Sequence, residues 1–464
     1  MSRKMGSLRL EFLKDWGGGL TNWTEKWIPD SLVIVWALSI IAYIFALIWG
    51  DVSPANAVHA WGKGFWILLK FGMQMCLVMM TGYILACSTP VKRLLNVLSS
   101  LPQSDKPWQA IMVMSLFSMI TAWFNWGLCL TGSALLALFI VKNNPKVDYR
   151  LLVAGAYLGL CCTWHAGLSA SAPLLVNTPN NFLIENGYLA NTISTSATIF
   201  APFNIILLLI VITVVTILMS VMHPSEDKTY RIKPELMNRL KLSESHIRPS
   251  GKLTPSEWLN WWPGWNIIIG LAGIWWLSKE VTEVGFYRAV NLNNINFFFL
   301  ILGIFFHWRP WSFLKATEEA GKAVWGIIVQ FPFYAGIFGL FKYTALATTF
   351  TNAFMAMSSN STFLLAVYWY AGILNYLIPS GGSEWIITAP YLLPAAIKSN
   401  ISVGKMVLAF CWGDMTTNLI QPFWAIAMLS IAKLEFREIM GWLLLVFVAL
   451  FIIVSTAFLF LPML

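Results

Sequence analysis

Residues 375–398 read NYLIPSGGSEWIITAPYLLPAAIK, an apolar run that is interrupted at residues 379–384 and then resumes. The interruption places Glu384 beside two glycines at the depth of a membrane span. Irregular backbone is tolerated at that depth only where protein buries it or where it lines a water-filled cavity, and an acidic residue there is a candidate for function. This segment is therefore predicted to form half of a transport site.

The composition is that of a membrane protein. The chain has 464 residues, of which 58% are hydrophobic and 11% charged, and its mean hydropathy is +0.68. A soluble protein of ordinary composition carries about 25% charged residues. The 25 Trp and 13 Tyr suit the many helix ends of a polytopic α-helical protein in a lipid bilayer. Residues 1–30 lack the compact apolar core of a cleavable signal peptide, so the first span is expected to direct its own insertion.

Other classes of protein lack support in the sequence. The net charge of +9 comes from basic residues scattered through short loops, which indicates membrane topology and not nucleic-acid binding. No P-loop, Rossmann glycine pattern, HExxH, GxSxG or CxxC motif occurs, so we expect no ATP-driven step, no catalytic residue and no cofactor. The cysteines lie in or beside apolar runs and are interpreted as packing residues. They are Cys76, Cys87, Cys129, Cys161, Cys162 and Cys411.

Apolar runs and their interruptions divide the chain into parts. Uninterrupted spans are predicted at residues 31–49, 64–87, 198–222, 264–278, 293–306, 324–341 and 439–461, and interrupted ones at 109–141, 150–178, 361–397 and 402–432. The predicted parts are a cytoplasmic N-terminal segment (1–30), a first transmembrane repeat (31–222), a cytoplasmic linker (223–262) and a second repeat with one extra helix (263–464).

The two halves repeat one another in their residues as well as in their hydropathy. Segment 123–133 parallels segment 373–383, and segment 156–163 parallels segment 410–414. Weak internal symmetry with matched interruptions is the best sequence pointer to a transporter site. We therefore predict an all-α polytopic membrane protein of two inverted-topology repeats, each with a re-entrant helical hairpin and a broken transmembrane helix.

The distribution of charge agrees with this topology. If segments 109–141 and 361–397 are re-entrant hairpins and the other interrupted runs cross, cytoplasmic segments hold 23 of the 30 Lys and Arg residues and external segments hold 6. Such a bias follows the positive-inside rule. It predicts a protein of the bacterial cytoplasmic membrane with a cytoplasmic N-terminus, and it places the two hairpins on opposite sides.

Four ionisable residues fall within the apolar runs, and three of them lie at interruptions: Lys70, His165, Glu384 and Asp414. Glu384 is interpreted as a carboxylate that couples transport to an ion or binds substrate; the alternative is an acid at a hairpin tip that faces water. Asp414 is interpreted as a ligand of the coupling ion, with unwound carbonyls; the alternative is a solvated cap of a half-helix that starts at Thr416.

The other two ionisable residues have strong structural alternatives. A lone histidine in a polar break, such as His165, is often only a hydrogen-bonded structural residue. Lys70 shares a helix face with Gln74 and lies near one end of its span, so its amine is expected to reach the membrane interface.

The interruptions supply the groups that a small anion needs. Helix N-termini present unpaired N–H groups and a partial positive charge, glycine lets the backbone approach closely, and hydroxyl groups add donors. The expected substrate-binding residues are Asn125, Gly127, Thr131, Gly132, Ser133, Thr163, His165, Asn375, Ser380, Gly381, Gly382, Ser383, Asn418 and Gln421. No metal site is certain, but a coupling Na+ would be expected near Asn125, Asn375 and Asp414. Trp424 is interpreted as a packing residue.

Four motifs carry a resemblance to a known family. At NYLIPSGGSEW (375–385), NLIQPFW (418–424), FGMQM (71–75) and QFPFYAGI (330–337), the chain resembles the short-chain fatty acid uptake transporters, the AtoE family, from about Trp27 to the last span. The resemblance implies the inverted repeats, re-entrant hairpins and elevator-type alternating access of a wider ion-transporter superfamily, and a homodimer in many members. It also implies uptake of acetoacetate, butyrate and similar monocarboxylates, with proton or cation symport.

The sequence departs from the family pattern at the interruptions. Where a relative reads PSGGGHW, this chain reads PSGGSEW at 379–385, and GE is replaced by Gly413-Asp414. Where a relative reads TWGGG, this chain reads TWHAG at 163–167, and Lys70 replaces a small apolar residue. Exchange of ionisable residues between the two breaks is expected to affect the coupling ion or the substrate.

These observations predict a symporter that takes up a short-chain monocarboxylate with H+ or Na+, with Glu384 and Asp414 coupling the two fluxes. One alternative is a carrier of another small anion or a zwitterion, for which Lys70 or His165 supplies a counter-charge. A membrane-embedded acyltransferase that uses His165 as base is less favoured, because it needs one asymmetric site and not two matched breaks. A passive channel would show flux without coupling.

Overall fold

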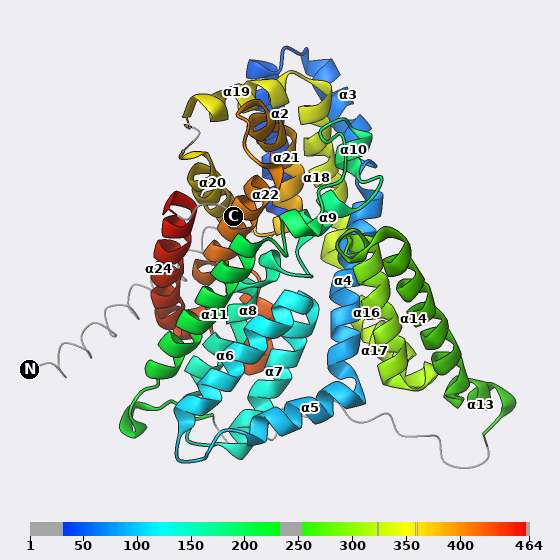
Figure 1. Ribbon diagram of the computed structural model, residues 1–464, viewed down its shortest axis with the longest axis vertical. Coiled ribbons are helices and arrows are strands. Elements are labelled where there is room, and N and C mark those ends of the chain that lie inside the picture. Colours follow the sequence, from blue (N-terminus) through cyan, green and yellow to red (C-terminus); the bar gives the residue numbers. More distant parts are fainter. Residues whose placement is uncertain (1–30, 233–252, 323, 358, 360, 461–464) are drawn as a thin grey trace, which may run out of the picture.

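The computed structural model describes residues 31–232, 253–322, 324–357, 359 and 361–460. The predicted N-terminal segment 1–30 and the part of the predicted linker at 233–252 lie outside the described residues. Within them, all regular secondary structure is helical (Figure 1).

The helices of the first half are α2 (Ser31–Trp49), α3 (Pro54–Gly64), α4 (Leu69–Cys87), α5 (Thr89–Ser100), α6 (Pro107–Phe124), α7 (Trp126–Asn143), α8 (Tyr149–Cys162), η1 (Trp164–Ala166), α9 (Ser171–Asn177), α10 (Phe182–Glu185), η2 (Thr195–Ala197) and α11 (Pro202–Val221). Those of the second half are η3 (Glu226–Lys228), α13 (Pro255–Trp261), α14 (Gly264–Val284), α15 (Phe286–Ala289), α16 (Leu292–His307), α17 (Pro310–Gly321), α18 (Trp325–Tyr343), α19 (Leu346–Met357), α20 (Phe363–Leu377), α21 (Gly381–Lys398), α22 (Val403–Thr417), η4 (Asn418–Ile420), α23 (Ala425–Ala432) and α24 (Phe436–Phe460).

Eight helical segments of the described chain are long and apolar enough to cross a membrane. They are Leu32–Trp49, Leu69–Cys87, Pro107–Phe124, Trp126–Asn143, Tyr149–Glu185, Pro202–Val221, Trp325–Tyr343 and Phe436–Phe460. The prediction of an all-α polytopic membrane protein is confirmed.

Several boundaries differ from the prediction. The predicted span 64–87 begins later, at Leu69, because the chain turns between α3 and α4. Helix α3 was not predicted; Ser53 caps it by accepting from the N–H of Asn56, and Pro54 occupies its first position, where the missing N–H costs nothing. The predicted loops also contain α5 and α17, whose mixed apolar and polar faces suit the edge of a membrane.

The two interrupted stretches enter the molecule from opposite ends. Helices α6 and α7 lie in the lower part of Figure 1 and meet at Asn125, whereas α20 and α21 lie in its upper part and meet before Gly381. Asn125 ends one helix and starts the next, because its side chain accepts from the N–H of Leu128 at 2.9 Å. The inverted relation of whole repeats stays a prediction.

A second pair of discontinuous helices lies against these hairpins. Helix α8 packs along α6 and is followed by η1 and α9, while α22 packs along α20 and is followed by η4 and α23. Glycines permit the close approach: a Cβ on Gly159 would collide with the carbonyl oxygen of Ser118, and one on Gly413 with that of Tyr368. The predicted break at Asp414 is wrong in position, because α22 continues to Thr417.

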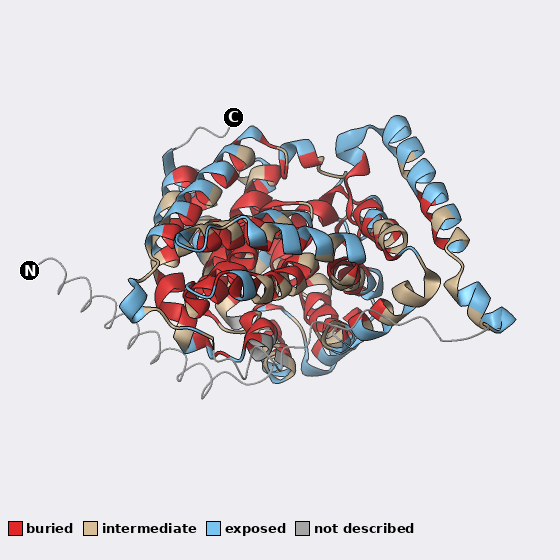
Figure 2. Cartoon of the chain, turned by 90° about the horizontal axis from the view of Figure 1, so that it is seen from below, coloured by how far each residue is buried: buried red, intermediate tan, exposed pale blue. Residues whose placement is uncertain are grey.

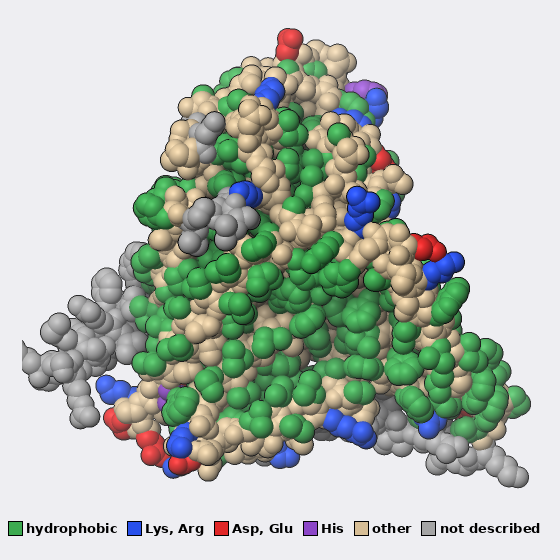
Figure 3. Space-filling model, viewed as in Figure 1, with side chains coloured by type: hydrophobic (Ala, Val, Ile, Leu, Met, Phe, Trp, Pro, Cys, Tyr) green, Lys and Arg blue, Asp and Glu red, His purple; other side chains and the backbone are tan. Residues whose placement is uncertain are grey.

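The outer helices present apolar side chains to their surroundings. Buried residues concentrate in the centre of the molecule (Figure 2), and hydrophobic side chains cover much of the face shown in Figure 3. Large apolar residues with more than half of their surface exposed occur on three outer helices: Ile40 and Ile48 on α2, Leu209 and Ile217 on α11, and Leu271 and Trp275 on α14. So much exposed apolar surface fits contact with lipid and not with water.

Asp148 fastens the start of α8 to the segment that follows α11. Its Oδ1 accepts from the N–H of Leu151 and its Oδ2 from the N–H of Tyr230, at 2.9 and 2.8 Å. Its own N–H donates to Nε2 of His223 at 3.1 Å. Burial lowers the pKa of His223, so that this nitrogen remains free to accept. The side chain of Asp148 is fully buried.

Replacement of this carboxylate is expected to destabilise the fold. Asp148→Ala removes a helix cap and leaves two backbone donors without their acceptor, which costs about 2 kcal/mol. Thermal unfolding of the purified protein in detergent should occur at lower temperature for Asp148→Ala than for Asp105→Ala, which alters an exposed aspartate. Equal unfolding temperatures would show that Asp148 does not hold this junction.

Candidate functional site

A cavity with about 480 Å³ of empty space lies where the interrupted helices of the two halves meet. Its polar lining comes from Ser171, Ser380, Gly381, Gly382 and Asn418. Its remaining lining residues are apolar or aromatic: Met75, Trp126, Leu160, Trp164, Ile327, Phe331 and Trp424. A concave site with apolar walls and a few converging polar groups is the usual form of a small-molecule site.

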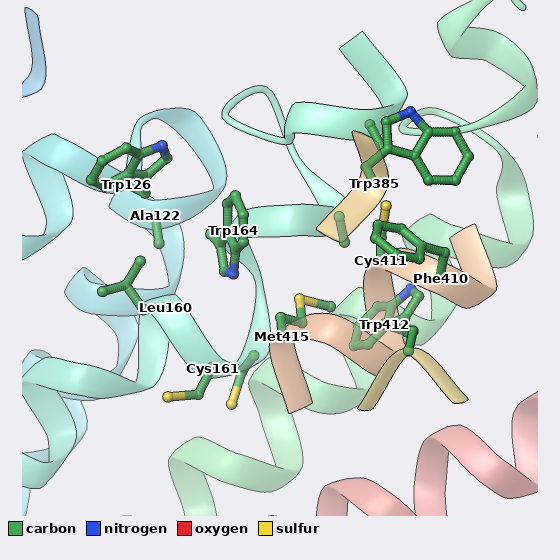
Figure 4. Packing of buried hydrophobic residues seen from close by; sticks show 14 of the residues in the cluster. Ala122, Trp126, Leu160, Cys161, Trp164, Trp385, Phe410, Cys411, Trp412 and Met415 are labelled. Carbon is green, nitrogen blue, oxygen red and sulfur yellow. The ribbon is translucent and has the colours of Figure 1, made fainter. Parts of the chain in front are cut away.

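Tryptophan side chains from both halves form much of the apolar wall. The rings of Trp126 and Trp424 meet edge to face, with centroids 5.6 Å apart. Trp164 lies between Trp126 and Leu160 on one side and Met415 on the other (Figure 4). Trp424 was interpreted as a packing residue in preference to a ligand, and it lines the cavity.

The first turn of α21 supplies the polar end of the cavity. Gly381 and Gly382 line it, and an α-helix has no internal acceptor for the N–H groups of its first turn. The helix dipole adds partial positive charge at the same place. Ser380 also lines the cavity, and its hydroxyl oxygen lies 3.0 Å from that of Ser383, which is buried behind the lining. This end of the cavity can hold a carboxylate.

Directly behind Gly381, His165 and Asp414 join the two halves of the chain. Nδ1 of His165 lies 2.5 Å from Oδ2 of Asp414, and both side chains are fully buried. Nε2 of His165 faces the hydroxyl of Ser171 at 2.9 Å and the N–H of Ala172 at 3.4 Å. Because a backbone N–H can only donate, Nε2 is assigned as an acceptor and Nδ1 as the donor to Asp414.

Glu384 lies beside this pair and has no hydrogen-bond partner among the described residues. Its side chain is fully buried, and neither carboxylate oxygen is bonded; Oδ1 of Asp414 is unbonded as well. The two carboxyl groups are close enough to interact electrostatically. Two adjacent buried carboxylates cannot both carry charge at low cost, so the site is suited to holding a proton.

The arrangement has a second chemical interpretation. The order Ser171, His165 and Asp414 is that of a serine nucleophile, its base and an orienting carboxylate in acyl-transfer enzymes. Only Ser171 of these three lines the cavity. The sequence motifs alone did not indicate this serine, although the run Ser169-Ala170-Ser171 before Pro173 is rich in small polar residues.

Asn375, Asn418 and Gln421 form a network that holds the break after α22. Nδ2 of Asn375 donates to the carbonyl oxygen of Asp414 at 2.7 Å and to Oδ1 of Asn418 at 2.9 Å. Nε2 of Gln421 donates to the same Oδ1 at 2.9 Å, and Nδ2 of Asn418 donates to the carbonyl oxygen of Leu160 at 2.7 Å. Of the three, Asn418 lines the cavity; the other two position it.

The residues predicted in the first half do not line this cavity. Asn125 caps α7, the hydroxyl of Thr163 donates to the carbonyl oxygen of Met119 at 2.7 Å, and Gly127 lies against the carbonyl oxygen of Met79. The segment 131–133 was expected at the break, but α7 starts at Trp126 and places Thr131, Gly132 and Ser133 in its second turn. A role for these residues in substrate binding stays a prediction.

Lys70 and Gln74 also lie apart from the cavity lining. Lys70 is exposed and its Nζ donates to the carbonyl oxygen of Asn180 at 3.3 Å. Gln74 is buried and donates to Asn293. Among the lining residues that sequence reasoning missed, Ile327 carried no signal, because it lies in the unbroken helix α18; Phe331 lies in the motif at 330–337, to which no binding role was assigned.

Discontinuous helices around a buried cavity, in a chain with many apolar spans, define a multi-pass membrane transporter. The sequence belongs to the short-chain fatty acid transporter family, whose profile matches residues 12–461. Two relatives carry the name "Putative short-chain fatty acid transporter". The one from Escherichia coli (strain K12) is 35% identical over 91% of this chain and 94% of its own length. The one from Haemophilus influenzae is 32% identical over 95% of this chain and 98% of its own length.

Solved structures share the fold. The YdaH transporter of Alcanivorax borkumensis superposes with a TM-score of 0.58 at 15% identity, and the alignment covers 93% of this chain and 98% of that one. MtrF of Neisseria gonorrhoeae, from a class described as antimetabolite efflux pumps, gives 0.51 at 12% identity, with 97% of each chain covered. At such identities the likeness concerns the fold alone.

Gly381 keeps the cavity in contact with the buried pair. A Cβ there would lie 2.6 Å from Cε1 of His165 and 2.7 Å from Oδ2 of Asp414, so Gly381→Ala must displace them. A Cβ on Gly382 would meet only ordinary contacts, with Phe71 at 3.5 Å and Met75 at 3.6 Å.

We expect Gly381→Ala to reduce uptake of a labelled short-chain fatty acid into proteoliposomes by tenfold or more. Gly382→Ala should mainly raise KM, because it narrows the cavity and leaves the pair in place. Gly62→Ala, where nothing lies within 4 Å of the added Cβ, is the control for insertion and folding. Similar losses in Gly381→Ala and Gly382→Ala would contradict this account.

Proposed function

We propose that this transporter takes up short-chain monocarboxylates such as butyrate and acetoacetate across the bacterial cytoplasmic membrane, by symport with H+ or Na+. The observation that carries the proposal is the lining of the cavity, which combines the start of α21 and a few polar side chains with aromatic and aliphatic residues. A short-chain carboxylate likewise combines one polar group with an apolar chain. Membership of the family and the printed names of the relatives support this substrate class.

In the proposed complex the carboxylate accepts from the N–H groups of Gly381 and Gly382, and Ser380 and Asn418 add polar contacts. The alkyl chain then lies against Trp126, Leu160 and Trp424. Each buried CH₂ group contributes about 0.8 kcal/mol, so the apolar wall gives substantial affinity even for a short chain. The N-terminus inside the cell, which the distribution of Lys and Arg predicts, is part of the same proposal. So are a homodimer and elevator-type alternating access, which the family resemblance implies.

Transport of a zwitterion or of a doubly charged anion has less support. Such substrates need a further charged group in the cavity wall, and the two candidates for a counter-charge were Lys70 and His165. Lys70 is exposed and bonded elsewhere, while both ring nitrogens of His165 face Asp414 or Ser171. A single carboxylate therefore suits the described lining better.

The serine, histidine and aspartate order keeps an acyl-transfer activity as the second candidate. Its discriminator is chemical: purified protein would hydrolyse p-nitrophenyl butyrate, and Ser171→Ala would abolish the reaction. A transporter without this activity leaves the ester intact.

The test of the proposal is uptake of labelled acetoacetate and butyrate into proteoliposomes under separately imposed proton and sodium gradients. Protein-free liposomes are subtracted, because the protonated acids cross lipid unaided. Accumulation that either unlabelled acid competes away, and that amino acids do not, would support the proposal. No uptake of either acid under any gradient by folded protein would overturn it.

The apolar wall is expected to set the preferred chain length. Leu160→Ala enlarges the cavity and keeps the backbone carbonyl that accepts from the side chain of Asn418. The ratio of hexanoate to butyrate uptake should rise roughly fourfold for each extra CH₂ accommodated.

The control is Leu152→Ala, which removes a leucine on the same helix that is equally buried but does not line the cavity. It should lower stability without a change in the ratio. An unchanged ratio in Leu160→Ala would place the alkyl chain elsewhere.

A further inference from the structure

Glu384 is the one fully buried carboxylate of the cavity region that has no bonded oxygen among the described residues. Asp414 contacts the imidazole of His165, but Glu384 forms no ion pair and no hydrogen bond with any described residue. A permanently ionised carboxylate in this position would be costly, because nothing replaces the water it has lost. A carboxyl group that gains and loses a proton during a working cycle does not need a permanent partner.

The groups that interact with Glu384 are acids or weak acids. They are Asp414 and Cys411 from α22, Tyr370 from α20 and Tyr391 from α21 itself, and His165 of η1 is connected to Glu384 through Asp414. Tyr334 of α18 reaches the neighbouring Ser383. None of the described groups in this set is a lysine or an arginine, so Glu384 can be neutralised only by a proton or by a bound cation.

A hydrogen-bonded chain connects this carboxyl group to the cavity. Ser171 lines the cavity and faces Nε2 of His165 at 2.9 Å, and Nδ1 of the same ring faces Asp414 at 2.5 Å. Asp414 in turn lies beside Glu384. The chain therefore begins at a surface that substrate and water can reach and ends at a group that they cannot.

The position of Glu384 makes its charge matter to the substrate. It belongs to the first turn of α21, whose N–H groups are the proposed carboxylate site. The two negative charges would then lie about one helical turn, ~5.4 Å, apart. At an effective dielectric constant of about 20 their repulsion weakens binding on the order of 100-fold. Protonation of Glu384 removes this repulsion.

We propose that Glu384 carries the coupling proton, that one proton accompanies each carboxylate, and that Ser171 and His165 conduct this proton between the cavity and the Asp414–Glu384 pair. The inference rests on the proposed function and selects H+ over Na+ as the coupling ion. With Glu384 protonated and substrate bound, the site holds the same net charge as with Glu384 ionised and substrate absent. The site can therefore cross the membrane loaded with proton and substrate, and return empty, without net movement of charge.

The proton steps balance without another reactant. A proton from the cavity binds Nε2 of His165 through the Ser171 hydroxyl, Nδ1 releases its proton to Oδ2 of Asp414, and Asp414 passes a proton to Glu384. The imidazole ends neutral with its proton on Nε2. Release on the other side runs the same steps in reverse and restores the proton to Nδ1.

The test compares net accumulation with exchange in proteoliposomes, with acetoacetate as the probe. The wild-type protein should accumulate acetoacetate when the outside is more acidic, should not respond to a sodium gradient alone, and should not change rate when a potassium–valinomycin potential is imposed. Glu384→Gln mimics the protonated state. It should lose accumulation by tenfold or more, yet exchange external label for internal acetoacetate at close to the wild-type rate and independently of pH.

Two further variants complete the design. Ser171→Ala should slow proton-driven accumulation several-fold more than it slows exchange, whereas a merely structural role would slow both alike. Glu283→Gln alters an exposed acid that pairs with Lys279 on α14, and should behave as wild type.

Each other outcome overturns the proposal. Accumulation by Glu384→Gln, or wild-type accumulation that follows sodium, would remove Glu384 or the proton from the coupling while the proposed function stands. Loss of both exchange and accumulation in folded Glu384→Gln would assign Glu384 to substrate binding. A wild-type protein that neither accumulates nor exchanges any tested acid would overturn the proposed function itself, and the inference with it.

Discussion

The absence of water at membrane depth is the constraint on which this structure depends. Each place where a helix stops inside the apolar layer leaves backbone groups that only the protein can satisfy. Asn125 and Asn418 lie at such places and are fully or almost fully buried. Their side-chain amides form hydrogen bonds with neighbouring backbone groups. The breaks are thus held by specific polar side chains, and the surrounding helices must cover them.

This constraint also explains why neither half of the chain builds the site alone. His165 comes from the break after α8, whereas Asp414 and Glu384 come from α22 and α21. Their contact joins residues 249 positions apart in the sequence. Removal of either partner would leave a buried polar group unsatisfied, which costs more than the pair itself contributes. The chemistry of the site therefore depends on how the two halves of the chain pack against each other.

The cavity shows how an apolar environment is combined with an anion site that needs no cationic side chain. Its polar end consists largely of backbone N–H groups and hydroxyls at the start of α21, which carry partial charge at fixed positions. A lysine or arginine there would need its own desolvation to be offset. Glycine at 381 is required for the same reason, since it allows the backbone to form the surface and lets the buried pair lie directly behind it, whereas a Cβ on Gly382 would meet only ordinary contacts.

The sequence alone determined the class of fold and the positions of most interruptions. Apolar runs longer than a membrane span, broken at Asn125, Thr163 and Pro379, can only be read as helices that stop inside the bilayer, because the local cost of exposed backbone is independent of the rest of the fold. The sequence also singled out His165, Glu384 and Asp414, since a charge in an apolar run is visible without any structure.

Only the tertiary structure decided which of these groups meet. It placed Thr131, Gly132 and Ser133 inside α7, moved the second break from Asp414 to Asn418, and brought Ser171, Ile327 and Phe331 to the cavity. The local sequence pattern indicates whether a residue can end a helix or enter an apolar layer. Contacts between residues more than 200 positions apart depend on how complete helices pack. The close approach of helices at glycines and the burial of paired polar groups result from that packing. They cannot be predicted from any single segment of the chain.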